Sequence, residues 1–229
     1  MKKLIRNRQG FTLIELLVVI SIIAILATLA PTAVNGVLGT ANRMKAVSNV
    51  RQIGLALKQF ASDNDGIFPD KKRDGTSEAS DANDAFGTLV PEYVADKRLF
   101  FVKGSAYTPK APDGKITNQD NPLQGGENEW AYLMGLTETS PGRWPLVVSG
   151  PNNGTKYSAD RTVEGGVWEG KVSIVLRADG SANAEPLDKQ NLTIPADHDK
   201  KADALVPAPN AQPPWLGSKI RVLNPKKAS

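Results

Sequence analysis

Apolar side chains dominate a long stretch near the start of the chain. Between Leu13 and Val34 every residue is apolar except one glutamate, one serine and two threonines, and no charged side chain occurs from Leu16 to Asn42. About 20 helical residues of this kind cross the roughly 30 Å hydrocarbon core of a bilayer. The pattern therefore predicts a membrane-spanning helix over about residues 13–34.

Helical periodicity continues beyond this stretch, because apolar residues still recur every three or four positions. They are Val47, Val50, Ile53, Leu57 and Phe60. The sequence "DNDG" at 63–66 consists of turn residues that should end the helix. We therefore expect one helix over about residues 11–62, with a kink where Pro31 interrupts its hydrogen bonds.

The rest of the chain has the shorter periods of a mixed domain. A polar loop at 70–88 is expected to lead into a short helix near 85–90. Apolar runs bounded by glycine and proline predict short strands at 98–102 and 144–149. These elements indicate strands and a small helix rather than further long helices.

The clearest strand signal is at Lys171–Arg177, where apolar and polar residues alternate. Asp179-Gly180 follows directly and is a strong signal for a β-hairpin. We therefore predict an α+β fold in which an antiparallel sheet packs on the outer half of the long helix.

The expected organisation has four parts. They are a leader at 1–10, the long helix at 11–62, an α+β domain at 63–204 and an extended, proline-rich tail at 205–229.

Charge is concentrated in the leader. Lys2, Lys3, Arg6 and Arg8 are four of the 28 basic residues, and the 24 that remain match the 24 acidic residues of the rest of the chain. A nucleic-acid-binding domain keeps a basic surplus on its folded part, so nucleic acid is not an expected partner. Basic residues mark the cytoplasmic end of a membrane helix, which places the leader in the cytoplasm and the domain outside. The chain has no cysteine, which excludes disulfides and thiolate metal sites.

A secretory signal peptide would also begin with basic residues before an apolar stretch. The apolar segment has no Ala-x-Ala cleavage site, and a cut after Ala30 would leave Pro31 next to the scissile bond. The pattern therefore favours a retained helix over an ordinary signal peptide.

The sequence "GFTLIEL" at 10–16, between a basic leader and an apolar helix, resembles the processing motif of type IV pilins and type II secretion pseudopilins. The resemblance implies that a prepilin peptidase cuts between Gly10 and Phe11 and that Phe11 is then N-methylated. It identifies Glu15 with the acidic residue of the family motif. Pro31 lies 20 residues after Phe11, one fewer than in the common family pattern, so the kink would be displaced.

The same resemblance implies a location and partners. The chain would be a single-pass protein of the inner membrane with a cytoplasmic N-terminus and a periplasmic domain, and it would enter a periplasmic or surface filament. Expected partners are prepilin peptidase, other pilin or pseudopilin subunits, an inner-membrane assembly platform and membrane lipids.

Glu15 needs a physical explanation, because an ionised carboxylate costs roughly 2.5–3.5 kcal/mol at the centre of a membrane helix on insertion scales. The ammonium created at Phe11 by cleavage would lie about 6 Å of helical rise away. The ammonium of a neighbouring subunit is a second candidate partner, and it would reward correct register during assembly. In the third interpretation, the carboxylate only reaches the lipid headgroups.

Three further segments, "GENEWAYLMGL", "WPLVVSGP" and "GGVWEGKVSIVLRADGS", resemble pilin-like proteins of planctomycetes and verrucomicrobia. They cover about half of the expected exported part, and they imply no catalytic activity.

Candidate chemistry elsewhere is weak. His198, the single histidine, lies in the polar run "ADHDK" without a serine motif, so we interpret it as a loop residue rather than part of a triad. Asp63 and Asp65 fit a helix end better than a calcium loop. Calcium held by the segment Asp197-His198-Asp199 with the nearby Asp203 stays open as an alternative. We expect no enzyme activity, no cofactor and no metal site.

The sequence therefore predicts a pseudopilin of a type II secretion system that supports protein export. A type IV pilin for adhesion, motility or DNA uptake fits the same motif. A membrane-tethered binding module is the alternative from a different class of protein.

Overall fold

A computed structural model describes most of the chain. The described residues are 11–114, 122–152, 154–197, 199–200, 202–206 and 220–228, and within helix α1 the side chains of residues 28–37 lie outside the description. The chain divides into two compact units, Met1–Ala41 and Asn42–Ser229. Each unit is described by itself.

Helix α1 covers Leu13–Asp63, which confirms the predicted long helix to within about a turn at each end. It ends where predicted, with the Gly66 amide donating to the carbonyl of Ala61 over 2.8 Å and Gly66 at φ 77°. A glycine adopts this conformation without steric cost, which is why the turn sequence ends the helix here.

The backbone of α1 is helical through Pro31. The kink at Pro31 stays a prediction. The membrane span at 13–34 also stays a prediction, because the structure does not describe the side chains of residues 28–34. In the described part of the chain, no helix has the length and apolar character needed to cross a membrane.

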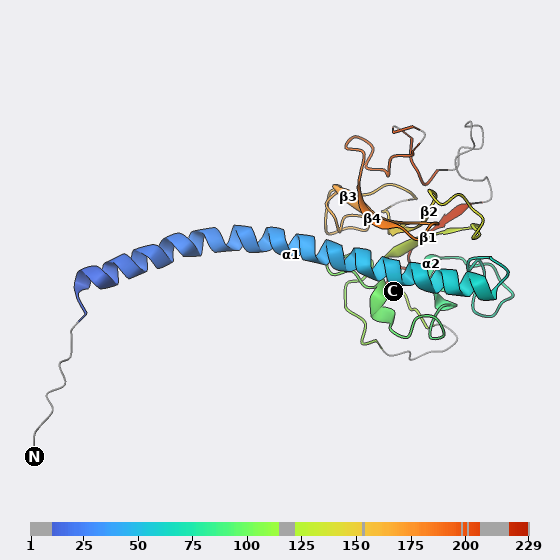
Figure 1. Ribbon diagram of the computed structural model, residues 1–229, viewed down its shortest axis with the longest axis horizontal. Helices are drawn as coiled ribbons and strands as arrows, with labels where there is room; N and C mark the ends of the chain where they lie inside the picture. The colour runs from blue at the N-terminus through green and yellow to red at the C-terminus, as the bar shows by residue number, and fades with distance from the viewer. Residues whose placement is uncertain are drawn as a thin grey trace, which may run out of the picture. The chain divides into compact units, whose positions relative to one another are not determined.

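Five strands form one sheet in the second unit (Figure 1). They are β1 (Trp130–Met134), β2 (Pro145–Ser149), β3 (Val172–Arg177), β4 (Ala182–Pro186) and β5 (Arg221–Leu223). The order across the sheet is β4-β3-β2-β1-β5, and every neighbouring pair is antiparallel. The predicted α+β fold with an antiparallel sheet is therefore confirmed.

The predicted hairpin joins β3 to β4. The amide of Arg177 donates to the carbonyl of Ser181 over 2.8 Å, and the Asp179 carboxylate accepts the Ser181 amide over 2.8 Å. Gly180 has φ 91°, a conformation that a side chain would strain. The local turn chemistry therefore sets the register of this hairpin.

Both faces of β3 are covered. Side chains alternate between the two faces of a strand, so Leu176 and Ser173 point in opposite directions. Leu176 packs on α1, where a Cβ added at Gly54 would lie 2.8 Å from its side chain. The Ser173 hydroxyl meets the Tyr157 hydroxyl at 3.0 Å on the other face. The loop that carries Tyr157 therefore covers the face of β3 on which Ser173 lies.

Two short helices depart from the predicted elements. Helix α2 covers Ala82–Gly87, three residues before the predicted helix. A 3₁₀ helix at Lys97–Phe100 occupies the segment predicted as a strand at 98–102, so that prediction is wrong. Asp96 caps the 3₁₀ helix by accepting the amide of Arg98 over 2.9 Å, and the Phe100 ring packs 5.3 Å from that of Phe86.

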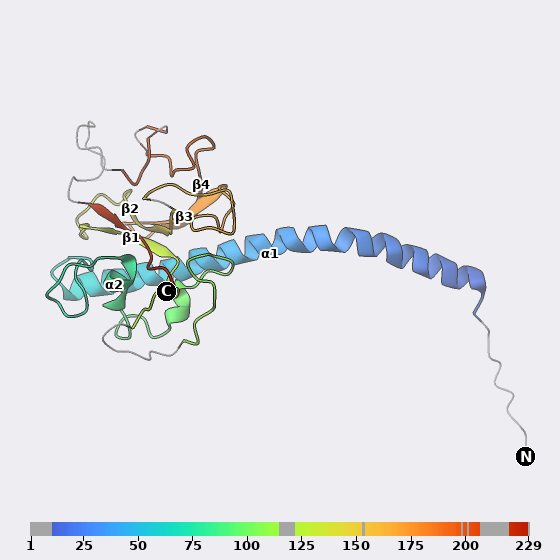
Figure 2. The same cartoon turned by 180° about the vertical axis from the view of Figure 1, so that it is seen from behind.

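The C-terminal segment returns to the sheet, as Figure 2 shows for the red strand β5 beside β1. Leu223 is buried opposite Tyr132, and the amide of Lys226 donates to the Asn83 side chain over 3.0 Å. The prediction of an extended tail from residue 205 onward is therefore wrong for residues 220–228. The short alternating segment there completes the edge of the sheet, although the prolines before it suggest a free tail.

Candidate functional site

The first turn of α1 is closed by a reciprocal pair of side chains. The Glu15 carboxylate oxygen Oε2 accepts the backbone amide of Thr12 over 2.8 Å and the Thr12 hydroxyl over 2.7 Å. In return, the Glu15 amide donates to the Thr12 hydroxyl oxygen over 3.3 Å. This arrangement is a capping box, which satisfies amides that have no partner inside the helix.

The capping box was not predicted, although the sequence contains its signal. Thr12 and Glu15 have the spacing of the motif, with a threonine three residues before a glutamate. The sequence pattern led us to expect only an electrostatic role for Glu15. The structure adds a local role, because the carboxylate is bonded to the residue that directly follows Phe11.

The large apolar side chains around this cap are unburied. Phe11 is 77% exposed and Leu13 is 87% exposed, and the other large apolar residues up to Leu26 are also exposed. A contiguous apolar surface of this kind marks contact with a membrane or with another protein. The first unit therefore has an exposed apolar surface suited to contact with a membrane or another protein, and this surface begins at the proposed cleavage point.

The predicted site residues do not all lie at one place in the structure. Glu15 and Phe11 lie at the start of α1, whereas Gly10 lies outside the described residues. Pro31 is 16 residues beyond Glu15, about 24 Å along the helix, so it belongs to a different part of α1. The roles assigned to these residues stay predictions.

Residues 5–31 match the family model described as the prokaryotic N-terminal methylation motif. This motif indicates a subunit of the pilin or pseudopilin type. It implies processing by prepilin peptidase, assembly with other subunits of that type, and a place in a membrane or a filament. No curated protein and no solved structure matches the chain.

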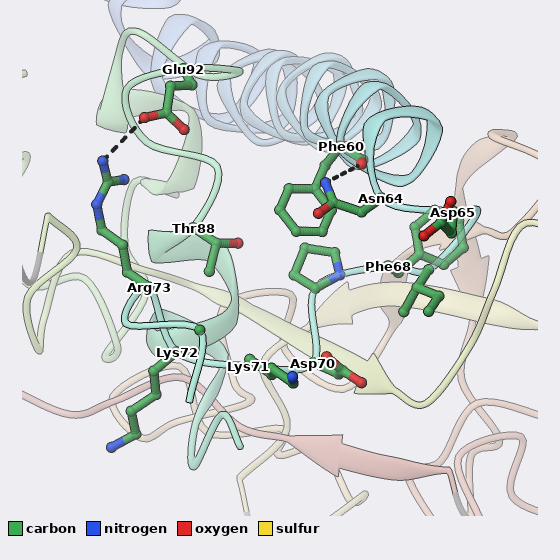
Figure 3. A pocket seen from close by; sticks show the side chains of 13 residues that line it. Phe60, Asn64, Asp65, Phe68, Asp70, Lys71, Lys72, Arg73, Thr88 and Glu92 are labelled. Carbon is green, nitrogen blue, oxygen red and sulfur yellow. Dashed lines mark hydrogen bonds and ion pairs between the residues drawn. The ribbon is translucent and has the colours of Figure 1, made fainter. Parts of the chain in front are cut away.

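The second unit has a pocket of about 590 Å³ at the end of α1 (Figure 3). Many of its polar side chains form hydrogen bonds or ion pairs within the domain. The Arg73 guanidinium donates to the carbonyl of Val90 and contacts the Glu92 carboxylate at 3.3 Å, and the Asn64 amide donates to the carbonyl of Phe60 over 2.7 Å. These contacts support the shape of the loop.

The candidate calcium ligands have other partners. Asp63 accepts the hydroxyl of Tyr93 over 3.0 Å, and Asp197 lies 3.5 Å from Arg177. Asp203 accepts the amide of Leu205 over 2.9 Å. His198 lies outside the described residues. Among the described side chains, no group of three acidic or histidine residues is placed to hold a metal ion.

One unusual carboxyl group was not predicted. Glu129 is completely buried, its Oε2 accepts the hydroxyl of Ser105, and its Oε1 has no partner within the described part of the chain. Burial raises the pKa of Glu129 to about 8, because the charged form loses its hydration. Glu127, two residues earlier, instead forms an ion pair of 2.6 Å with Lys97, so sequence alone does not separate the two glutamates.

Proposed function

We propose that this protein is a pseudopilin of a type II secretion apparatus, a structural subunit rather than an enzyme. Helix α1 anchors it in the inner membrane as a single span and later packs in the core of a filament, and the second unit occupies the periplasm. The observation that carries this proposal is the methylation motif at residues 5–31, which leads into the exposed apolar surface of α1.

Processing prepares the chain for assembly. Prepilin peptidase cuts between Gly10 and Phe11, and the new N-terminus at Phe11 receives one methyl group. The ammonium formed at Phe11 then lies next to the Thr12 amide that the Glu15 carboxylate accepts. The carboxylate is therefore held where it can neutralise a positive charge, in its own chain or in a neighbouring subunit.

The remaining parts of the proposal follow from this anchor. An inner-membrane platform extracts the processed subunit from the lipid and adds it to the filament, whose growth moves folded proteins toward the outer membrane. The segments that resemble planctomycete and verrucomicrobial pilin-like proteins fit such a subunit. The type IV pilin role rests on the same N-terminal motif.

The test combines a mass measurement with a secretion assay. Mass spectrometry of the membrane-extracted protein should find a chain that starts at Phe11 and carries one added methyl group. Deletion of the gene should leave exported proteins in the periplasm, while surface attachment and twitching stay normal. A chain that starts at Met1 or Pro31 would contradict the processing. Lost attachment with normal export would identify a type IV pilin instead.

A further inference from the structure

Five cationic side chains lie close together at the start of the second unit. We call them, with Trp168, the Trp168 basic surface. The cations are Arg43, Lys45, Lys103, Arg161 and Lys171. Arg43 is half-buried and the other four are exposed.

Trp168 and Glu169 organise one half of this surface. The Arg43 guanidinium carbon lies 6.0 Å from the centroid of the Trp168 ring, within the range of a cation–π contact. The Glu169 carboxylate lies 2.5 Å from the Lys171 ammonium and 3.6 Å from the Arg161 guanidinium. Lys171, and after it Arg161 and Arg43, lower the pKa of Glu169. A single carboxylate is therefore shared among three cations.

The other half lies directly beside it. Lys45 and Lys103 line the same shallow hollow of about 100 Å³ on α1. Gly104, the residue after Lys103, approaches Arg161. A Cβ added at Gly104 would lie 3.5 Å from an Arg161 nitrogen. The approach of Gly104 to Arg161 joins the two halves of the surface.

The charge of this surface is poorly compensated. The Asp160 carboxylate, which precedes Arg161 in the sequence, accepts the amide and hydroxyl of Thr162 over 2.8 and 2.7 Å. Within the described part of the chain, no carboxylate lies within 4.0 Å of the cationic atoms of Arg43, Lys45 or Lys103. The chain beyond residue 10 is neutral as a whole, so this is a local concentration of positive charge.

The position in the chain suggests what this charge meets. Arg43 follows Val34, the last residue of the predicted membrane-spanning stretch, by only nine residues in the sequence. Basic residues close in sequence to a membrane span are attracted to anionic lipid headgroups. We propose that the Trp168 basic surface docks onto the phosphate headgroups of the anionic phospholipids around the anchor.

Other occupants fit the observations less well. A second copy of the chain would need a complementary acidic surface, and the acids of the pocket at the far end of α1 are accompanied by Lys71, Lys72 and Arg73. A nucleic acid would be expected to meet a basic surplus over the whole domain, and the chain has none. The inference rests on the membrane anchor of the proposed function.

The test uses the full chain in vesicles. The protein has no cysteine, so Thr162→Cys, at an exposed position beside Arg161, gives a single site for a dye. Energy transfer from this dye to acceptor-labelled headgroups should be higher in an equimolar mixture of phosphatidylcholine and phosphatidylglycerol than in phosphatidylcholine alone. Salt should weaken the difference, because it screens exposed charges.

Paired charge reversals locate the effect. Lys45→Glu with Lys103→Glu should lower the ratio of docked to undocked protein on anionic vesicles by roughly fivefold for each cation lost. Lys58→Glu with Lys71→Glu makes the same change of net charge elsewhere and should leave energy transfer unaltered.

The outcomes distinguish a failure of the docking from a failure of the membrane anchor. Flotation of the unaltered chain with both kinds of vesicle, with equal energy transfer in both, would overturn the docking alone. A loss of self-association in the Lys45→Glu, Lys103→Glu variant, with unchanged lipid proximity, would make the surface a subunit contact and contradict the proposal. If the unaltered chain floats with neither vesicle, the anchor itself is wrong, and the docking with it.

Discussion

At the scale of single residues, Glu15 combines a helix cap with a charge. Its carboxylate accepts two hydrogen bonds from Thr12, and a glutamine side chain at the same position can also complete a capping box. Substitution by glutamine therefore removes the charge and keeps the cap, whereas alanine removes both. The structure thus shows which substitution isolates the electrostatic role.

We predict that Glu15→Gln is inserted and cut normally but assembles poorly. Neither insertion nor cleavage uses the carboxylate, while neutralisation of the Phe11 ammonium in the lipid does. The measurement is filament yield from sheared cells that overproduce the protein, beside a blot for cleavage. Co-expression with the unaltered protein should partly restore incorporation, because each subunit contributes an ammonium as well as a carboxylate.

Thr12→Ala is the matched control for the cap. It removes the hydroxyl from the capping box and leaves both the carboxylate and the Thr12-position amide in place. Its cost is roughly 1 kcal/mol of helix stability, which should leave filament yield near normal. Normal filaments from Glu15→Gln would mean that the carboxylate only reaches the headgroups.

Glu129 predicts a pH dependence of stability. With a pKa of about 8 in the folded protein and an ordinary value of 4.5 when unfolded, the folded state holds a proton between these pH values that the unfolded state has lost. This group therefore lowers the free energy of unfolding as pH rises from about 4.5 to 8, by at most about 1.4 kcal/mol per pH unit. Below and above this window its contribution is constant.

Glu129→Gln should remove this dependence, because an amide does not titrate in that range. Urea unfolding of the full chain, followed by tryptophan fluorescence, reports on the second unit because the first tryptophan is Trp130. The variant should gain stability relative to the unaltered protein as pH rises from 5 to about 8. Glu138→Gln, at an exposed position, is the control and should follow the unaltered protein. Parallel pH curves for all three proteins would exclude a buried proton at Glu129.

At the scale of elements, local signals were sufficient for α1 and for the β3–β4 hairpin. Both are specified by residues near one another in sequence, namely the apolar period with the turn at 63–66 and Asp179-Gly180. The segment at 98–102 has the composition of a strand and lacks a pairing partner. It becomes a 3₁₀ helix because Asp96 caps it and Phe100 packs on Phe86.

The strands that sequence missed depend on distant contacts. β1 lies between β2 and β5 and all five of its residues are buried, so it shows no alternation of apolar and polar positions. β5 has three residues, and it becomes a strand because Leu223 pairs with Tyr132, which is 91 positions earlier. Neither feature can be recognised from a short window of sequence, because tertiary packing overrides local propensity here.

At the scale of the whole molecule, the two units differ in how much of them the sequence explains. The motif in the first unit was recognised from "GFTLIEL", although the reciprocal bonds of Thr12 and Glu15 were not. In the second unit, the buried Glu129 and the cluster around Trp168 join residues from separate segments. These sites exist only after folding, so spacing along the chain cannot reveal them.

The return of the chain to β5 changes where the folded unit ends. The fragment Asn42–Ser229 keeps the edge strand and the bond from the Lys226 amide to Asn83. It should be soluble and unfold in one cooperative transition. A fragment that ends at Leu205 exposes the edge of β1 and the apolar surface beneath Leu223, so it should aggregate or unfold without cooperativity.

Point variants of the longer fragment separate packing from length. Leu223→Ala should lower the free energy of unfolding by about 2–4 kcal/mol, because it leaves a cavity beside Tyr132. Val206→Ala, at a side chain that is 48% exposed, should change it by less than about 0.5 kcal/mol. Urea titrations of both variants and both fragments, read by tryptophan fluorescence, give the comparison. Equal and cooperative unfolding of the two fragments would show that the domain is complete at Leu205 and that β5 contributes nothing to its stability.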